Sequence, residues 1–207
     1  MKNFFDTENF LWRWFGKLGS FLGLSLLWLL CCLPVITSIP GSIALYDSVA
    51  HCVRGNEDHA FRHFFRTLKK ELLRGIGLSL LWGLFGFILF YGYSILYQAG
   101  KESQIASIYS LVYLGSMLIP MGILAWLIPI ETRFSHSFVS LHKTAATFAL
   151  AHLPTTAAIL GIGLVSIVLI LFLPILLILM PAIAVTIQCW LIEKVFLKYM
   201  PKEQEGA

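Results

Sequence analysis

The stretch CCLPVITSIPG, residues 31–41, closes a long apolar run and combines two prolines, two hydroxyl residues and a glycine. Proline lacks a backbone N–H and clashes with the preceding turn, so it ends or kinks a helix. We therefore predict an apolar helix over residues 18–34, a break, and a short helix over residues 41–54. Whether the chain leaves the bilayer at this break or turns back into it determines the topology of the whole chain.

The composition indicates an integral membrane protein, because 58% of the residues are hydrophobic and only 13% are charged. A soluble domain of this length could not bury that much apolar side chain. Asp, Glu, Lys and Arg are missing from residues 18–46, 75–100, 103–130 and 144–192. A helix needs roughly 20 apolar residues to cross the hydrocarbon core, and the last run is long enough for two crossings.

These runs predict a single all-α membrane domain over residues 1–207. We expect a compact bundle of about five to six membrane-embedded helices, with a Pro-broken N-terminal helical hairpin and two basic amphipathic cytoplasmic helices. Beyond the first two helices, the predicted spans cover residues 75–98, 104–130, 150–172 and 175–197. Pro174 or Pro181 lies near the turn between the last two.

The distribution of Lys and Arg orients these spans, because cytoplasmic loops attract positive charge. If residues 34–53 return through the membrane, only Lys101 of the fifteen Lys and Arg residues lies outside. If they do not return, the outer side also receives Lys2, Arg13 and Lys17. We therefore predict a multi-pass plasma-membrane protein whose N- and C-termini both face the cytoplasm.

The short second helix has one apolar and one polar face when it is drawn at 100° per residue. The apolar face contains Leu45, Tyr46, Val49, Cys52 and Val53, and the polar face contains Asp47, His51 and Arg54. Two readings stay open: a tilted hairpin that re-enters the bilayer, and a surface helix on the outer side with the N-terminus outside. Backbone groups that lose their helical partners at the break need other partners if the break lies in lipid. The candidate structural or functional residues of this region are Pro34, Thr37, Pro40, Asp47, His51 and Arg54.

A basic amphipathic helix is predicted over residues 61–74, in the sequence FRHFFRTLKKELLRG. Its apolar residues share one arc at helical spacing, and its cations lie opposite. Such a helix lies in the lipid headgroup layer or docks on a cytoplasmic protein, and both readings stay open. A second such helix is predicted over residues 133–148. The candidate docking residues are Phe61, Arg62, Phe64, Phe65, Arg66, Lys69, Lys70 and Arg74.

The sequence offers little catalytic or metal-binding chemistry. His59 and His63 lie one helical turn apart, with Cys52 and Asp58 nearby, but they form no compact four-ligand set. No phosphate-binding glycine loop, HExxH motif or GxSxG motif occurs. We therefore predict that the chain is not an enzyme, holds no metal or cofactor, and has no nucleic-acid partner. The four cysteines give no disulfide pattern and are read as free thiols.

Residues 27–49, LWLLCCLPVITSIPGSIALYDSV, resemble the YesL-like family of small bacterial membrane proteins. The matching residues are Trp28, Leu33, Pro34, Thr37, Pro40, Ala44, Leu45 and Tyr46, followed by the basic segment FFRTLKKELLRG. The chain departs from the family at Ile39, where family members often have glycine. Family members occur mainly in Gram-positive bacteria and tend to be encoded beside carbohydrate ABC importers and polysaccharide-degrading enzymes.

The resemblance implies an accessory subunit of a carbohydrate ABC importer, with the lipid bilayer and the importer's permease or ATPase subunits as partners. The alternative is a stand-alone transporter or channel for a small neutral solute such as a sugar. Tyrosines near the predicted outer loop could stack on sugar rings, although an interfacial aromatic belt explains them equally well. These are Tyr91, Tyr93, Tyr97, Tyr109 and Tyr113.

Overall fold

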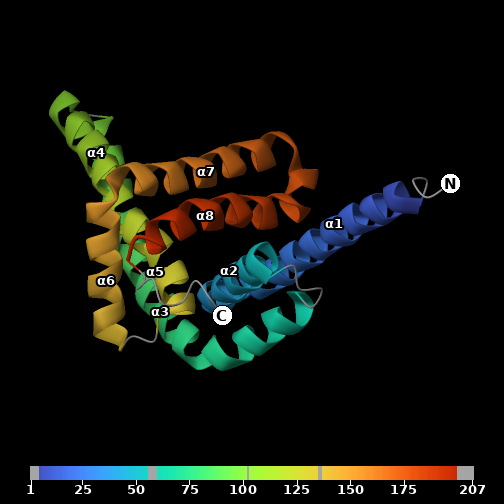
Figure 1. The fold of residues 1–207 in the computed structure, drawn as a ribbon. Coiled ribbons are helices and arrows are strands. Elements are labelled where there is room, and N and C mark those ends of the chain that lie inside the picture. The colour runs from blue at the N-terminus through green and yellow to red at the C-terminus, as the bar shows by residue number, and fades with distance from the viewer. Residues whose placement is uncertain (1–4, 56–59, 102, 135–136, 200–207) are drawn as a thin grey trace.

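The structure is a computed structural model that describes residues 5–55, 60–101, 103–134 and 137–199, with side chains described from Gly19 onward except at 52–55. These residues form helices and connections, with no strand among them. The elements in chain order are α1 (Phe5–Cys32), η1 (Val35–Thr37), α2 (Ser38–Gly55), α3 (Ala60–Gly100), α4 (Gln104–Ser116), α5 (Leu118–Arg133), α6 (Phe138–Ala151), α7 (Leu153–Phe172), η2 (Pro174–Ile178) and α8 (Met180–Phe196) (Figure 1).

The predicted break after the first helix is present. α1 ends at Cys32, the single turn of 3-10 helix η1 follows Pro34, and α2 begins at Ser38 rather than at residue 41. Pro40 is accommodated because it lies in the first turn of α2, where a missing N–H costs no helical hydrogen bond.

α3 runs without interruption from Ala60 to Gly100, so the predicted amphipathic segment 61–74 and the predicted span 75–98 belong to one helix. Figure 1 shows the first turns of α3 leading along one edge of the molecule before the helix curves into its apolar part. Gly75 lies where the two parts meet and packs directly on Pro40: a Cβ added there would lie 2.6 Å from the Pro40 Cβ. Glycine continues the helix here and also permits close approach.

Two helix boundaries differ from the predictions. The second amphipathic helix begins at Phe138, because α5 continues to Arg133 and the chain then turns. The last helix begins at Met180 instead of residue 175, because residues 174–178 form η2 after Pro174. Pro174 therefore marks the turn between the final pair of helices, as the first of the two predicted alternatives stated.

α2 is the central element of the bundle. Ile43, Ala44, Leu45 and Val49 are almost completely buried, and α2 contacts α1, α3, α5 and α8. Its buried face joins two apolar clusters, one with Leu24 and Phe64, the other with residues of α5, α6 and α8. Burial on several sides explains why a helix of low overall hydrophobicity holds a fixed place in the fold.

An aromatic cluster holds the C-terminal helices together. The fully buried Trp126 of α5 donates a hydrogen bond from Nε1 to Thr156 Oγ1 of α7 at 2.8 Å. Its ring also lies against Phe148 of α6 and Phe196 of α8. Aromatic pairs at such distances add to the energy of burial alone, so this cluster fixes four helices at one point.

Within the described part of the chain, three helical stretches are long and apolar enough to cross a membrane, namely Ala60–Gly100, Gln104–Arg133 (α4 with α5) and Leu153–Phe172. Large apolar side chains such as Leu84, Phe90 and Leu171 are exposed along them, which suits contact with lipid and confirms the coarse prediction of a helical membrane protein. Figure 1 shows that α7 and α8 run across the direction of α4.

Candidate functional site

The segment around Pro34 satisfies its own backbone groups. Thr37 Oγ1 donates to the carbonyl oxygen of Cys31, with the Pro34 carbonyl at 3.0 Å, and Ser38 Oγ donates to the Val35 carbonyl at 2.7 Å. The Cys31 carbonyl lies in the last turn of α1, where helical partners are missing. The Pro34 and Val35 carbonyls also accept the backbone N–H groups of Thr37 and Ser38. Thr37 and Ser38 therefore make the local contacts that an apolar environment requires.

α2 folds back along α1. Trp28 Nε1 of α1 donates to Ser42 Oγ of α2 at 2.9 Å, and a Cβ added at Gly41 would lie 2.7 Å from the Cβ of Cys31. On the other side of α2, the Ile39 N–H donates to Ser79 Oγ of α3 at 3.2 Å. The break thus positions the start of α2 between α1 and α3.

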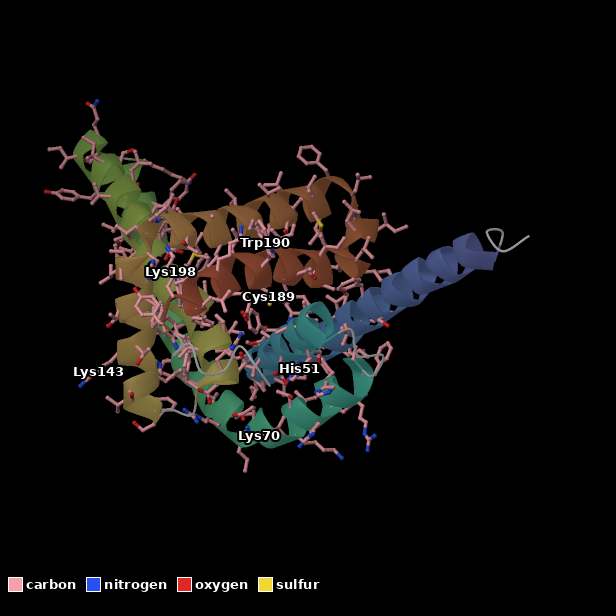
Figure 2. The ribbon with its side chains drawn as sticks, in the orientation of Figure 1. His51, Lys70, Lys143, Cys189, Trp190 and Lys198 are labelled. Atoms are coloured by element: carbon pink, nitrogen blue, oxygen red, sulfur yellow. The ribbon has the colours of Figure 1, made fainter. Side chains whose placement is uncertain are left out.

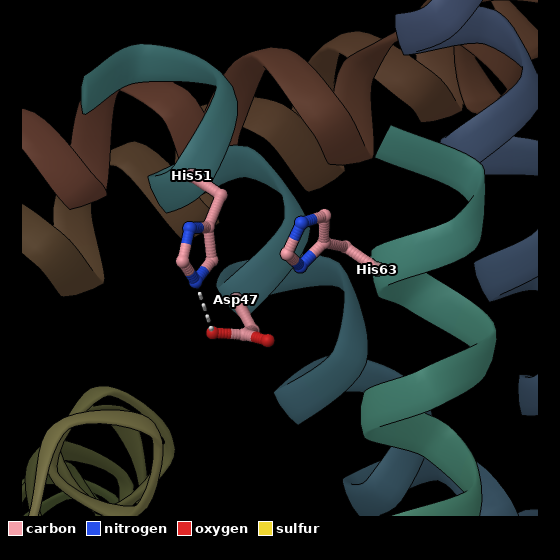
Figure 3. A group of neighbouring side chains, drawn as sticks. All are labelled: Asp47, His51 and His63. Atoms are coloured by element: carbon pink, nitrogen blue, oxygen red, sulfur yellow. Dashed lines mark ion pairs between the residues drawn. The ribbon is translucent and has the colours of Figure 1, made fainter. Parts of the chain in front are cut away.

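Three side chains of types that bind metals lie close together at the C-terminal half of α2 (Figure 3). Asp47 and His51 lie one turn apart on α2, and His63 reaches them from the first turns of α3. One ligand atom from each of the three lies within 4.8 Å of the others. Asp47 and His51 were predicted as polar residues of α2, whereas the participation of His63 was not predicted.

The geometry of this cluster is partly fixed. Thr67 Oγ1 donates to Asp47 Oδ2 at 2.5 Å, which holds the carboxylate. The other oxygen, Oδ1, lies 3.7 Å from His51 Nε2, and the rings of His51 and His63 stack with centroids 4.5 Å apart. Side-chain exposure is 18% for Asp47 and 48% for His51, so the cluster can be reached from outside the bundle.

The other predicted partners of this region fall outside what is described. The side chains of Cys52 and Arg54 are not described, and Asp58 and His59 lie outside the described residues. The sequence spacing relates His63 only to His59, its neighbour one helical turn away. Phe64, fully buried beside Leu45 and Val49, brings its neighbour His63 onto α2 instead.

The exposed face of the first turns of α3 is basic. Arg62, Phe65, Arg66, Lys69, Lys70 and Leu73 are exposed, and we call these six residues the α3 basic face. Figure 2 shows Lys70 at this outer edge. Lys70 Nζ also lies 3.2 Å from Glu71 Oε1, and the Lys70 side chain remains 79% exposed.

Three of the predicted docking residues have other contacts. Phe64 is fully buried in the core, so it is not available to lipid or to a partner. Phe61 lies against Gly23 of α1, where an added Cβ would meet its ring. Arg74 Nε lies 2.9 Å from Glu131 Oε1 of α5. The amphipathic pattern predicted a face for lipid or for a partner protein, but packing within the bundle uses part of that face.

Two ion pairs connect the helices beside this face. Glu131, whose side chain is 2% exposed, pairs with Arg74, and Arg133 of α5 pairs with Glu193 of α8. Glu131 and Glu193 lie near predicted helix ends, yet both are largely enclosed by protein. The sequence showed their positions along the helices but not the cationic partners that bury them.

An apolar groove of about 400 Å³ lies between α3 and the α4–α5 pair. Its lining includes Trp82, Phe85, Tyr93, Met117 and Met121 and is almost entirely apolar. Outside it, Tyr91, Tyr97 and Tyr109 are exposed. A surface of this kind suits an acyl chain or an apolar helix better than a sugar, which needs hydrogen-bonding groups.

Part of the chain matches the model of a protein family. Residues 21–93 match the model of a family described as "Protein of unknown function, DUF624", a segment that contains the Pro34 break, α2 and most of α3. No curated protein and no solved structure matches the chain. YesL-like proteins belong to this family. The predicted resemblance is therefore confirmed over residues 21–93, the part of the chain that carries the DUF624 sequence pattern.

Proposed function

We propose that this chain is a non-enzymatic membrane protein that acts as an interaction subunit, with the α3 basic face as its docking surface. The family resemblance suggests the permease or ATPase subunits of a carbohydrate ABC importer as the partner. The observation that carries the proposal is the α3 basic face itself, where four cations flank Phe65 and Leu73 on a firmly held helix.

The same helix is anchored on its opposite side. Phe64 is buried among residues of α1 and α2, and Arg74 pairs with the enclosed Glu131. The cations and the exposed Phe65 are therefore presented at fixed positions. A preorganised surface loses less conformational entropy on binding than a mobile one, and its positive charge favours an acidic partner surface.

The charge distribution supports a cytoplasmic location for this face. The hairpin topology, in which α2 returns through the membrane, leaves only Lys101 outside among the Lys and Arg residues. Lys143 on α6 then faces the same compartment, and it projects from the outer side of that helix (Figure 2). In a Gram-positive plasma membrane, both surfaces would be available to the cytoplasmic parts of an importer.

Site-specific photo-crosslinking in growing cells tests the proposal. A photoreactive amino acid replaces Lys69 in the full chain, and a matched control carries it at the exposed apolar Leu171 of α7. Cells are grown on a carbohydrate that induces the importer. We expect an adduct with a permease or ATPase subunit from position 69, lost in the variant Arg66→Glu/Lys70→Glu. Failure to obtain a protein adduct from position 69 in induced cells would contradict the proposal.

A stand-alone transporter for a small neutral solute is the second candidate. The break at Pro34 and the exposed tyrosines support this function. The groove between α3 and the α4–α5 pair is apolar, which does not suit the passage of a sugar. Uptake of radiolabelled sugars into proteoliposomes that contain only this protein separates the two functions. The interaction proposal expects no uptake above that of empty liposomes.

A further inference from the structure

We propose that Asp47, His51 and His63 form a binding site for a divalent transition-metal cation such as Zn²⁺, which joins α2 to the start of α3. Two imidazoles and one carboxylate are a donor set typical of zinc and related metals. The proposal goes beyond the interaction function and does not depend on the identity of the partner.

The distances are close to those that a metal requires. At a metal–nitrogen distance of about 2.0–2.1 Å and tetrahedral angles, ligand atoms lie roughly 3.3 Å apart. One ligand atom from each of Asp47, His51 and His63 already lies within 4.8 Å of the others. The 3.7 Å between His51 Nε2 and Asp47 Oδ1 exceeds a hydrogen bond and leaves a separation that a bridging cation would occupy.

The required adjustment falls on a side chain that can move. The rings of His51 and His63 stack with an interplanar angle of 23°. Their nitrogen lone pairs therefore lie in two nearly parallel planes, and at least one ring must turn for both to point at a common cation. His51 is half exposed, and rotation about its side-chain bonds brings Nε2 inward without moving the backbone.

The site also has an outer contact that orients a ligand. Thr67 Oγ1 holds Asp47 Oδ2 and leaves Oδ1 directed at the histidines, as hydrogen bonds to ligand carboxylates do in metal sites. Three protein ligands with one side open to solvent leave a fourth position for water. The bound cation would tie α2 to the helix that carries the α3 basic face.

The test uses the full chain, purified in detergent with a tag that contains no histidine and freed of metal with a chelator. Titration calorimetry with ZnCl₂ is expected to show one cation per chain. Asp47→Asn, His51→Gln and His63→Gln should each weaken binding by roughly tenfold or more, since even the loss of an outer contact costs 10–100-fold. The matched control is His142→Gln, because His142 packs on Trp82 outside the cluster.

Thermal unfolding gives an independent readout. Zn²⁺ should raise the unfolding temperature of the wild-type chain and of His142→Gln by similar amounts. The same Zn²⁺ concentration should raise that of His51→Gln clearly less, because a cation stabilises the folded state only to the extent that it binds it. If His63→Gln fails to fold, His51→Gln still decides, because its half-exposed side chain is not needed for packing. Equal Zn²⁺ affinity in wild type and His51→Gln, or no binding to either, would overturn the proposal.

Discussion

Replacing Arg74 by glutamine should destabilise the fold more than any exposed cation of α3 would. The Glu131 side chain is 2% exposed, and its Oε1 lies 2.9 Å from Nε of Arg74. The Arg74 side chain is 33% exposed. At an effective dielectric constant of about 20, two unit charges at this distance attract by roughly 6 kcal/mol before the cost of desolvation. Removing one partner of a buried pair typically costs about 3–5 kcal/mol.

The partial exposure of Arg74 places the expected loss at the lower end, about 3 kcal/mol. For a chain of this size, that corresponds to a fall of roughly 6–12 °C in the unfolding temperature. The reverse change, Glu131→Gln, should cost less, because the arginine that remains can turn toward water while a carboxylate left behind cannot. Arg66→Gln, on the exposed side of the same helix, is the control and should change stability by less than about 0.5 kcal/mol.

The assay is intrinsic tryptophan fluorescence during heating of the detergent-solubilised chain, for the two single variants and the double variant. The double variant should recover part of the loss, since neither charge is then buried alone. The reasoning is refuted if Arg74→Gln and Arg66→Gln unfold at the same temperature. It is also refuted if the effects of Arg74→Gln and Glu131→Gln simply add.

Two further predictions concern close packing near the Pro34 break. Gly75→Ala should destabilise the folded chain by about 1–3 kcal/mol, because the added Cβ would lie 2.6 Å from the Pro40 Cβ. Gly77→Ala is the control, because an added Cβ there has no neighbour within 4 Å, and it should be neutral or stabilise the chain. Equal unfolding temperatures for the two variants would contradict the packing of Gly75 on Pro40. Thr37→Val should lower the free energy of unfolding by about 1–2 kcal/mol, because the carbonyls of Cys31 and Pro34 lose their hydroxyl partner. Thr37→Ser keeps the hydroxyl and should unfold close to the wild-type temperature. If Thr37→Ser is destabilised as much as Thr37→Val, the hydroxyl does not stabilise the break.

Local sequence signals predicted the helices well. Charge-free runs located the apolar segments, and the prolines at 34 and 174 located two of the turns, because both signals act within a few residues. Gly75 shows the limit of local signals, because a glycine can end a helix or permit a close contact according to what packs on it. That information lies in Pro40, on another helix.

The candidate site could be predicted only in part, for the same reason. Asp47 and His51 are one turn apart, so their shared face follows from helical geometry. His63 joins them only because Phe64 is buried against α2, a tertiary contact between helices. The docking face shows the same limit: the pattern of Phe61, Phe64 and Arg74 was amphipathic, but no single-helix argument distinguishes a face that meets lipid from one that meets the rest of the bundle.

A docking role for the α3 basic face requires that this face lies on the cytoplasmic side of the membrane. Single cysteines at positions 5, 69 and 101, introduced in a background without the native cysteines, can be labelled with an impermeant maleimide on intact and on permeabilised cells. We expect position 101 to react on intact cells, and positions 5 and 69 to react only after permeabilisation. Labelling of position 69 on intact cells would place the basic face outside and contradict the docking proposal, and labelling of position 5 would show that α2 does not return through the membrane.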